Sequence, residues 1–202
     1  IVASRCIERY YKPTIILTES NDMATGSARS VDGFDVYQAI AECADLLDQF
    51  GGHKYAAGIT LPTQNVDAFK ERFEQVVAKT ITNEQTKPAI KADSVIFLDE
   101  INERFFKVIS QMAPFGPKNM QPVFVSENVF ASNVRLLKGE HLKFSVKQDD
   151  SSITFDAIGF GLGAYMDLVD CGMDFHMAYT IEENEYRGIR SLQLMIKDIK
   201  FD

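Results

Sequence analysis

In the first half of the chain, a short β-branched run lies between two amphipathic patterns. Residues 1–11 have helical spacing, whereas residues 13–18 (PTIILT) form a β-branched run bounded by proline and polar residues, which is typical of a buried strand. Apolar residues recur at helical spacing again from 35 to 50, with Asp35 as a candidate N-cap. We therefore expect one helix that ends at Gly51, where a Gly-Gly-His sequence begins.

A second strand and a second long helix complete this first part. Residues 56–62 (AAGITLP) fit a strand, and residues 65–81 place apolar side chains on one helical face with charges opposite. The stretch 82–89 (TNEQTKPA) is polar, contains a proline and lacks periodicity, so we expect a linker there. The sequence therefore predicts two domains, residues 1–85 and residues 86–202.

The second domain changes from a helical pattern to strict alternation. Residues 101–112 are expected to form a leading helix that is stopped by PFGP. The candidate strands that follow are residues 123–135, 142–147, 153–160, 174–181 and 190–199, separated by the turn-like segments KGE, DDSS and ENEYRG. Five such strands favour an OB-like barrel. The predicted fold class is therefore mixed α+β, a small α/β subdomain followed by an OB-like five-stranded β-barrel.

The composition is that of a globular protein. Apolar residues make up 46% and charged residues 25% of the 202 residues, which excludes a disordered or fibrous chain. No apolar run approaches the roughly 18 to 20 residues that cross a bilayer, and the start is too charged for a signal peptide. We expect a cytoplasmic protein with no membrane partner. The first residue is Ile, so we also expect a further part upstream.

The net charge limits how this chain can bind nucleic acid. With 21 Lys and Arg against 29 Asp and Glu, the formal charge is −8, whereas phosphate neutralisation normally needs a surplus of cations. Any contact with nucleic acid must therefore be local. The three cysteines and three histidines show no ligand spacing, so we expect no metal to be held by this chain.

The most informative stretch is FGGHKYAAG, residues 50–58. Two glycines at the end of a helix, Gly51 and Gly52, let the backbone approach a ligand and turn its N–H groups outward, while His53 can donate a hydrogen bond to a phosphate oxygen. The alternative is an ordinary helix C-cap beside a surface histidine. From these residues alone both interpretations remain open.

A second candidate for phosphate binding is GSARS, residues 26–30. Arg29 lies between two hydroxyls there, and arginine is suited to forked recognition of phosphate, with Ser27 as a neutral donor. The plainer interpretation is a solvated charge in a polar loop. Arg5, in the first helix, is weaker evidence because it can simply pair with Glu8.

The β domain has basic and aromatic residues near its first hairpin. The basic candidates are Lys138, His141, Lys143 and Lys147, and the aromatic ones are Phe144, Phe155 and Phe160. On an OB surface, stacking and a few lysines hold single-stranded DNA without reading its sequence. Alternating aromatics are otherwise core residues. This domain also has 13 Lys and Arg against 17 Asp and Glu, which favours docking onto a protein as a competing role.

The order of IVASR, PTIIL, GSARS and FGGHKYAAG resembles the DHH-associated subdomain of the DHH phosphoesterase superfamily, and it is close to RecJ exonucleases. The second half adds APFGPKNMQPVF, LLKGEHLKFSV and ITFDAIGF, which resemble the start and central strands of the RecJ OB-like domain. GGHKYAAG is shared across the superfamily, whereas APFGPKNMQP with its trailing β domain points to RecJ. The resemblance covers essentially the whole chain.

The resemblance implies a 5′-to-3′ single-stranded-DNA exonuclease of DNA repair and recombination. Arg29, Ser27 and the turn at 51–53 would contact nucleotide phosphates, joined by Arg5. Mn²⁺ or Mg²⁺ would be held by Asp and His motifs of a preceding DHH catalytic domain, which do not occur here, so this chain is expected to grip substrate without cutting it. The implied partners are single-stranded DNA, that catalytic domain, and a single-strand-binding protein or other repair proteins.

Two other functions remain open. The charge of −8 and the lack of metal motifs also suit a protein-interaction module. The Gly-Gly-His signature is shared with phosphodiesterases that act on short oligonucleotides or cyclic dinucleotides, although these normally lack the appended β domain.

Overall fold

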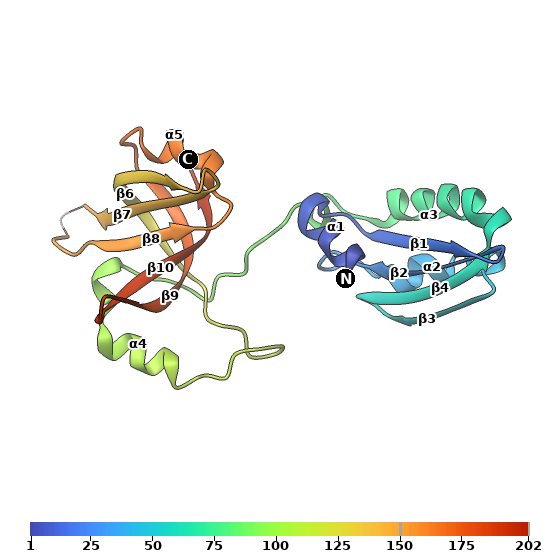
Figure 1. Cartoon of the computed structure of the whole chain (residues 1–202), viewed down its shortest axis with the longest axis horizontal. Helices are drawn as coiled ribbons and strands as arrows, with labels where there is room; N and C mark the ends of the chain where they lie inside the picture. Colours follow the sequence, from blue (N-terminus) through green and yellow to red (C-terminus); the bar gives the residue numbers. More distant parts are fainter. Residues whose placement is uncertain (150, 202) are drawn as a thin grey trace. The chain divides into compact units, whose positions relative to one another are not determined.

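The computed structural model describes residues 1–149 and 151–201, in two compact units, Ile1–Ala89 and Ile90–Asp202 (Figure 1). Each unit has its own hydrophobic core. None of the described helices is long and apolar enough to cross a membrane.

The first unit is a four-stranded antiparallel sheet with helices, in the strand order β1-β2-β4-β3. Its elements are α1 (Val2–Tyr10), β1 (Thr14–Ser20), β2 (Met23–Arg29), α2 (Val36–Ala41), η1 (Ala44–Leu46), β3 (Gln49–His53), β4 (Ala56–Pro62), η2 (Thr63–Asn65), α3 (Val66–Thr80) and η3 (Glu84–Thr86). The helices expected at 1–11 and 65–81 and the strands expected at 13–18 and 56–62 are confirmed.

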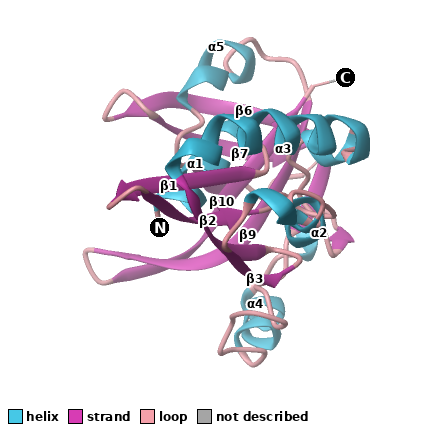
Figure 2. Cartoon of the chain, turned by 90° about the vertical axis from the view of Figure 1, so that its right-hand side faces the viewer, coloured by secondary structure: helices cyan, strands magenta, loops and turns pink. Residues whose placement is uncertain are grey.

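The two faces of this sheet differ because successive strand residues point to opposite sides. The inner face is apolar, and α3 runs along it in both views (Figures 1 and 2). Ile59 and Leu61 of β4 are buried there in one cluster with Phe69 and Val76 of α3. The outer face is polar and largely exposed, so its side chains are available for binding.

The helix expected from 35 to 50 is wrong beyond residue 41. Asp35 is the N-cap as expected, since its side chain accepts a hydrogen bond from Gln38 N at 3.0 Å, but α2 ends at Ala41 and the chain pairs with β4 from Gln49 onward. The apolar residues in this stretch keep helical spacing as far as Phe50, so pairing with β4 overrode the local pattern. The glycines therefore lie in an edge strand and not at a helix end.

A tight hairpin joins PTIILT to GSARS. β1 extends to Ser20 and β2 begins at Met23, so a two-residue turn, Asn21-Asp22, joins them. Both turn residues have positive φ angles, 53° and 57°, as a tight hairpin requires. Ser27 and Arg29 consequently lie inside a regular strand.

The second unit has the strand arrangement of an OB fold. Its elements are β5 (Ser94–Val95), η4 (Leu98–Glu100), α4 (Glu103–Ser110), β6 (Phe124–Leu137), β7 (His141–Gln148), β8 (Phe155–Gly159), η5 (Gly163–Tyr165), α5 (Met166–Val169), β9 (Phe175–Tyr186) and β10 (Ile189–Lys200). The long strands pair in the order β6-β7-β8-β10-β9, and β9 also pairs with β6. The five predicted strands, the leading helix and the mixed α+β class are confirmed, whereas β5 and α5 were not predicted.

Of the expected turns in this unit, KGE is confirmed and ENEYRG is shorter than predicted. β9 continues to Tyr186 and β10 begins at Ile189, so only Arg187-Gly188 forms the turn. The glutamates of β9 fit an exposed strand because Arg190 of β10 forms ion pairs with Glu183 at 3.3 Å and Glu185 at 3.2 Å. The DDSS segment includes Asp150, which lies outside the described residues.

Candidate nucleic-acid interface

Arg29 and His53 share the exposed face of the first sheet. Arg29 of β2 pairs with Ala56 of β4, and His53 of β3 pairs with Ala56 from the other side. Residues directly opposite each other in antiparallel strands point to the same face. The guanidinium and the imidazole therefore flank one small side chain and face the same patch of solvent.

The hairpin that carries His53 is fixed by the connection between β2 and α2. Ser30 N donates to Tyr55 O at 3.0 Å, and Val36 N donates to Lys54 O at 3.1 Å. Within the turn, Tyr55 N donates to His53 Nδ1 at 3.2 Å. Because Nδ1 is an acceptor, the neutral ring carries its proton on Nε2. His53 is therefore held as a donor, as phosphate binding requires.

Arg29 keeps most of its donors for a ligand. Its Nη1 donates to Ala28 O at 2.8 Å, which fixes the guanidinium against the sheet and leaves further N–H groups of the fork. Ser27 lies two residues along the same strand, so its hydroxyl is on the same face. Of the residues predicted to bind phosphate, the structure thus brings together Ser27, Arg29 and His53.

The two glycines of β3 differ in what they do. Gly51 pairs with Gly58, which pairs with Ser27, so this row of the outer face carries almost no side-chain bulk. A Cβ at Gly51 would meet no atom within 4 Å. Gly52 has a φ of +151°, and a Cβ there would lie 2.3 Å from Ala56 O. Gly51 keeps the face open, whereas the backbone itself requires glycine at 52.

Arg5 follows the plainer interpretation. It lies in α1, where its Nη1 donates to Glu8 Oε2 at 2.9 Å, and its side chain is 76% exposed. An exposed i,i+3 ion pair of this kind contributes little to stability. The structure does not place Arg5 in the row formed by Arg29 and His53.

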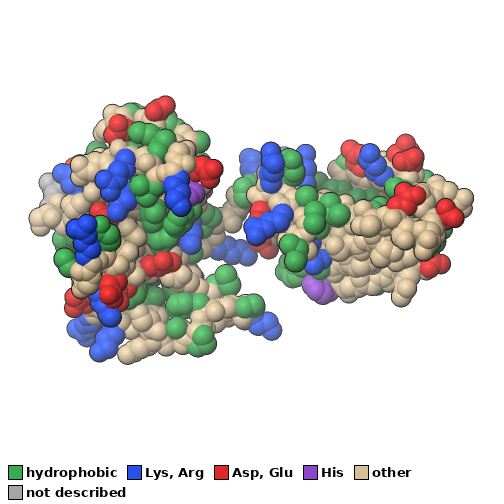
Figure 3. Space-filling model, in the orientation of Figure 1, with side chains coloured by type: hydrophobic (Ala, Val, Ile, Leu, Met, Phe, Trp, Pro, Cys, Tyr) green, Lys and Arg blue, Asp and Glu red, His purple; other side chains and the backbone are tan. Residues whose placement is uncertain are grey.

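The predicted basic residues of the OB unit gather around β7. Leu142, Phe144 and Val146 point into the core, so the alternating residues His141, Lys143 and Lys147 point outward. Lys138 lies in the turn that precedes β7. β7 and β8 are the second and third strands of the OB order, whose outer face binds oligonucleotides in this fold. Blue cationic side chains lie among green hydrophobic ones on the visible face of this unit (Figure 3).

Lys143 has one neighbour of each charge on this face. Its Nζ lies 3.1 Å from Asp156 Oδ2 of β8, and Arg135 of β6 is its direct cross-strand partner on the other side. Like charges directly opposite each other repel. An anion bound beside them would relieve that repulsion, although Asp156 competes for Lys143.

One aromatic pair is exposed beside these cations. Phe160 follows β8 directly and is 60% exposed, and its ring centroid lies 5.0 Å from that of His141 in an edge-on arrangement. Gly161 N donates to His141 Nδ1 at 3.2 Å, which fixes the imidazole. Phe144 and Phe155 are core residues, with exposed fractions of 1% and 9%. Of the three predicted aromatic residues, Phe160 alone is therefore exposed, and it lies beside His141.

Several residues of these surfaces were missed by sequence reasoning. Arg135 faces outward beside Lys143, and the alternation along residues 123–135 was the signal that marked it. Thr25, Thr60 and Gln49 lie on the same outer sheet face as Arg29. Finding them requires the strand register, which the Asn21-Asp22 turn between β1 and β2 helps to set.

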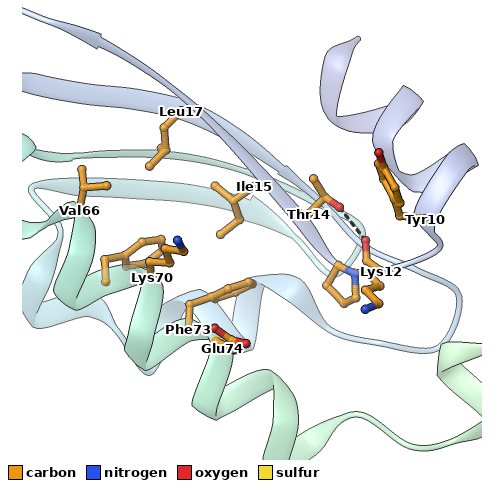
Figure 4. A pocket seen from close by; sticks show the side chains of 11 residues that line it. Tyr10, Lys12, Thr14, Ile15, Leu17, Val66, Lys70, Phe73 and Glu74 are labelled. Carbon is orange, nitrogen blue, oxygen red and sulfur yellow. Dashed lines mark hydrogen bonds between the residues drawn. The ribbon is translucent and has the colours of Figure 1, made fainter.

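A groove of the first unit lies elsewhere, between β1 and α3 (Figure 4). It has a volume of about 500 Å³ and is mainly apolar, with Ile15, Leu17 and Phe73 among its lining residues. None of the predicted phosphate-binding residues lines it. The groove is therefore separate from the Arg29–His53 row.

The described residues offer no metal centre. Within 1–149 and 151–201, no group of three or more His, Cys, Asp or Glu side chains is placed to hold a metal ion. A two-metal hydrolytic site needs such a set of ligands, so the residues of these ranges do not fit Mn²⁺ or Mg²⁺.

An antiparallel sheet with a Gly-Gly-His edge strand, followed by an OB unit whose strand β7 carries outward-facing basic side chains, is the arrangement of a DHH-associated domain joined to an OB domain. Comparison with known families agrees with this class. Residues 1–79 match the DHHA1 domain, and residues 92–198 match the RecJ OB domain, which is more than half of the chain. The chain belongs to the RecJ family.

Individual relatives match nearly the whole chain. The single-stranded-DNA-specific exonuclease RecJ of Bacillus subtilis is 32% identical over 202 residues, which cover 98% of this chain and 25% of the relative. RecJ of Escherichia coli is 28% identical and covers 98% of this chain, with 35% of its own length matched. The chain therefore spans about a quarter to a third of these curated relatives.

The fold is also that of solved RecJ structures. Crystal structures of Thermus thermophilus RecJ in complex with Mg²⁺ and with Mn²⁺ superpose on the whole chain with TM-scores of 0.80 and 0.81. The sequence identity is 22%, and 30% and 28% of those chains are covered. This likeness confirms the arrangement of secondary structure.

Proposed function

We propose that this chain grips the DNA substrate of a RecJ-type single-stranded-DNA-specific exonuclease, which removes nucleotides 5′ to 3′ in DNA repair and recombination in the cytoplasm. One observation carries the proposal: Arg29 and His53 present donors on the same open face, on either side of Ala56. The names of the curated relatives support the substrate class.

In this proposal the chain binds and orients, and the metals lie elsewhere in the enzyme. A guanidinium and a neutral N–H donor hold a phosphate by charge-assisted and ordinary hydrogen bonds. The His141–Phe160 pair and the cations of β7 hold the following strand by stacking and charge. Mn²⁺ or Mg²⁺ in a DHH catalytic domain would supply the activated water.

The test is a fluorescence-anisotropy titration with labelled, 5′-phosphorylated single-stranded DNA at low and physiological salt. Arg29→Ala and His53→Ala should each weaken binding, by about tenfold or more for the arginine. Arg29→Ala should also reduce the slope of log binding constant against log salt concentration by about 1. Arg72→Ala is the matched control, because this exposed arginine of α3 pairs with Asp45 and should change little.

Two results of this titration would contradict the proposal. One is an affinity that neither Arg29→Ala nor His53→Ala lowers, and the other is the absence of binding by the unaltered chain at low salt. A full-length protein with a DHH domain that has no manganese-dependent nuclease activity would also exclude it. A preference for dinucleotides over longer strands would favour a short-oligonucleotide phosphodiesterase instead.

A second candidate function is docking onto another protein. The acidic balance of the OB part, 13 Lys and Arg against 17 Asp and Glu from residue 86 onward, favours it over strong DNA binding by this unit alone. The partner in this proposal is a single-strand-binding protein or another repair protein. A pull-down at physiological salt tests it, and no retained partner would count against it.

A further inference from the structure

We propose that Thr25, Thr60 and Gln49 form a base-binding subsite for the nucleotide whose phosphate is held by Arg29 and His53. The inference rests on the proposed function and deepens it, because it assigns a second set of contacts on the same sheet face.

The strand register places these residues in one row. Thr25 of β2 pairs with Thr60 of β4, and Thr60 pairs with Gln49 of β3. The hydroxyl oxygens of Thr25 and Thr60 lie 3.4 Å apart. Thr25 and Gln49 are exposed and Thr60 is half-buried, so the row is open to a ligand.

This polar row lies at a fixed distance from the phosphate-binding row. Thr25 and Arg29 are four residues apart in β2, as are Gln49 and His53 in β3, so each pair shares the outer face. Four residues of a strand span about 13 Å, which is comparable to the length of one nucleotide from its phosphate to the far edge of its base.

Between the two rows the sheet is nearly bare. The intervening row is Ser27, Gly58 and Gly51, and a Cβ added at Gly51 meets nothing within 4 Å. Figure 3 shows a broad area over β3 and β4 where neither hydrophobic nor charged side chains gather. A sugar and base can therefore lie flat against the backbone between a cationic end and a polar end.

The chemistry of the polar row fits a base better than a second phosphate. Phosphate oxygens only accept hydrogen bonds and favour cationic donors, whereas hydroxyls and an amide both donate and accept. Base edges present donors and acceptors in different patterns. Because threonine hydroxyls rotate, the same row can adapt to each base, as a nuclease without sequence preference requires.

The test is a double-mutant cycle between this row and the terminal base, measured by anisotropy with the full chain. One 5′-phosphorylated oligonucleotide carries its 5′-terminal base, and a second is abasic at that nucleotide. The variant is Thr25→Val with Thr60→Val, which keeps the β-branched shape and removes the hydroxyls. Thr154→Val, an exposed threonine of the other unit, controls for loss of a hydroxyl elsewhere.

The unaltered chain should bind the abasic strand about fivefold or more weaker, since each hydrogen bond contributes about fivefold. The double variant should bind the intact strand about fivefold or more weaker than the unaltered chain does. It should bind the abasic strand with the same affinity as the unaltered chain. An equal loss with both strands, or no loss, would overturn the subsite. If the subsite failed in this way but Arg29→Ala still weakened binding, the proposed function would stand without the subsite. If the unaltered chain bound no DNA, both the subsite and the proposed function would be overturned.

Discussion

Arg29 and His53 are partners of the same residue, Ala56, in the register of the first sheet. They are far apart in sequence, and the pairing of β2, β4 and β3 alone brings them to one row. The two candidate phosphate donors therefore lie on one face of the sheet. This face differs from the helix-end turn that the Gly-Gly-His sequence suggests, because the neighbouring row at Gly51 and Gly58 is open.

Gly52→Ala should destabilise the first unit, whereas Gly51→Ala should not. A Cβ at 52 would clash with Ala56 O at 2.3 Å and with Ala57 Cα at 2.5 Å, at a φ of +151°. Strain of this kind costs about 1–3 kcal/mol. A substitution at an open, exposed site such as Gly51 changes the free energy of unfolding by about 0.5 kcal/mol at most. Chemical denaturation of both variants measures this difference, and equal stabilities would refute the assignment.

Phe160→Ala should weaken binding of single-stranded DNA by roughly fivefold to a hundredfold, since stacking contributes about 1–3 kcal/mol per base. Met173→Ala is the matched control, because Met173 is 56% exposed, close to the 60% of Phe160. Anisotropy titration at one salt concentration checks the pair of variants. If Met173→Ala and Phe160→Ala have the same effect, the His141–Phe160 surface is not a stacking site.

Asp156→Asn should strengthen DNA binding and steepen its salt dependence. Asp156 Oδ2 lies 3.1 Å from Lys143 Nζ, so its removal frees that cation and leaves it beside Arg135. Lys143→Ala should have the opposite effect and reduce the salt slope by about 1. Asp174→Asn, at an exposed position after α5, controls for the change in net charge. Equal gains from Asp156→Asn and Asp174→Asn would exclude a local role for Lys143.

The element types were predictable wherever one periodicity dominated. The alternation in the OB part predicted all five long strands, and the amphipathic pattern predicted α3. The prediction for 35–50 failed because its apolar residues keep helical spacing as far as Phe50, whereas the hydrogen bonds that make β3 a strand come from β4. The pattern of residues 35–50 alone carries no information about β4 as a pairing partner.

The candidate site was predictable as residue types but not as a surface. Arg29, Ser27 and His53 were identified from phosphate chemistry and family resemblance, whereas the Thr25–Thr60–Gln49 row depends on register alone. Register follows from turn length, and a one-residue error reverses every side chain. The OB cations were found because they lie within β7 or in the turn just before it, while Arg135 joins them only across a hairpin.

Tyr179→Phe should lower the stability of the OB unit at neutral pH and reduce its loss of stability in alkali. The Tyr179 hydroxyl is buried and lies 2.8 Å from Ser126 Oγ, a hydrogen bond that contributes about 1 kcal/mol. Burial raises the pKa of Tyr179 from 10 to about 12. Between pH 10 and pH 12 the unfolded state therefore loses this proton and the folded state keeps it, so stability falls with pH by at most about 1.4 kcal/mol per unit.

Denaturation at pH 8 and at pH 11 measures both effects in the Tyr179→Phe variant. Tyr186→Phe is the control, since Tyr186 is 65% exposed at the end of β9. The unaltered chain and Tyr186→Phe should lose more stability between the two pH values than Tyr179→Phe does. An identical alkaline loss in all three would mean that the Tyr179 hydroxyl reaches solvent before the unit unfolds, and that its hydrogen bond to Ser126 does not hold β9 to β6.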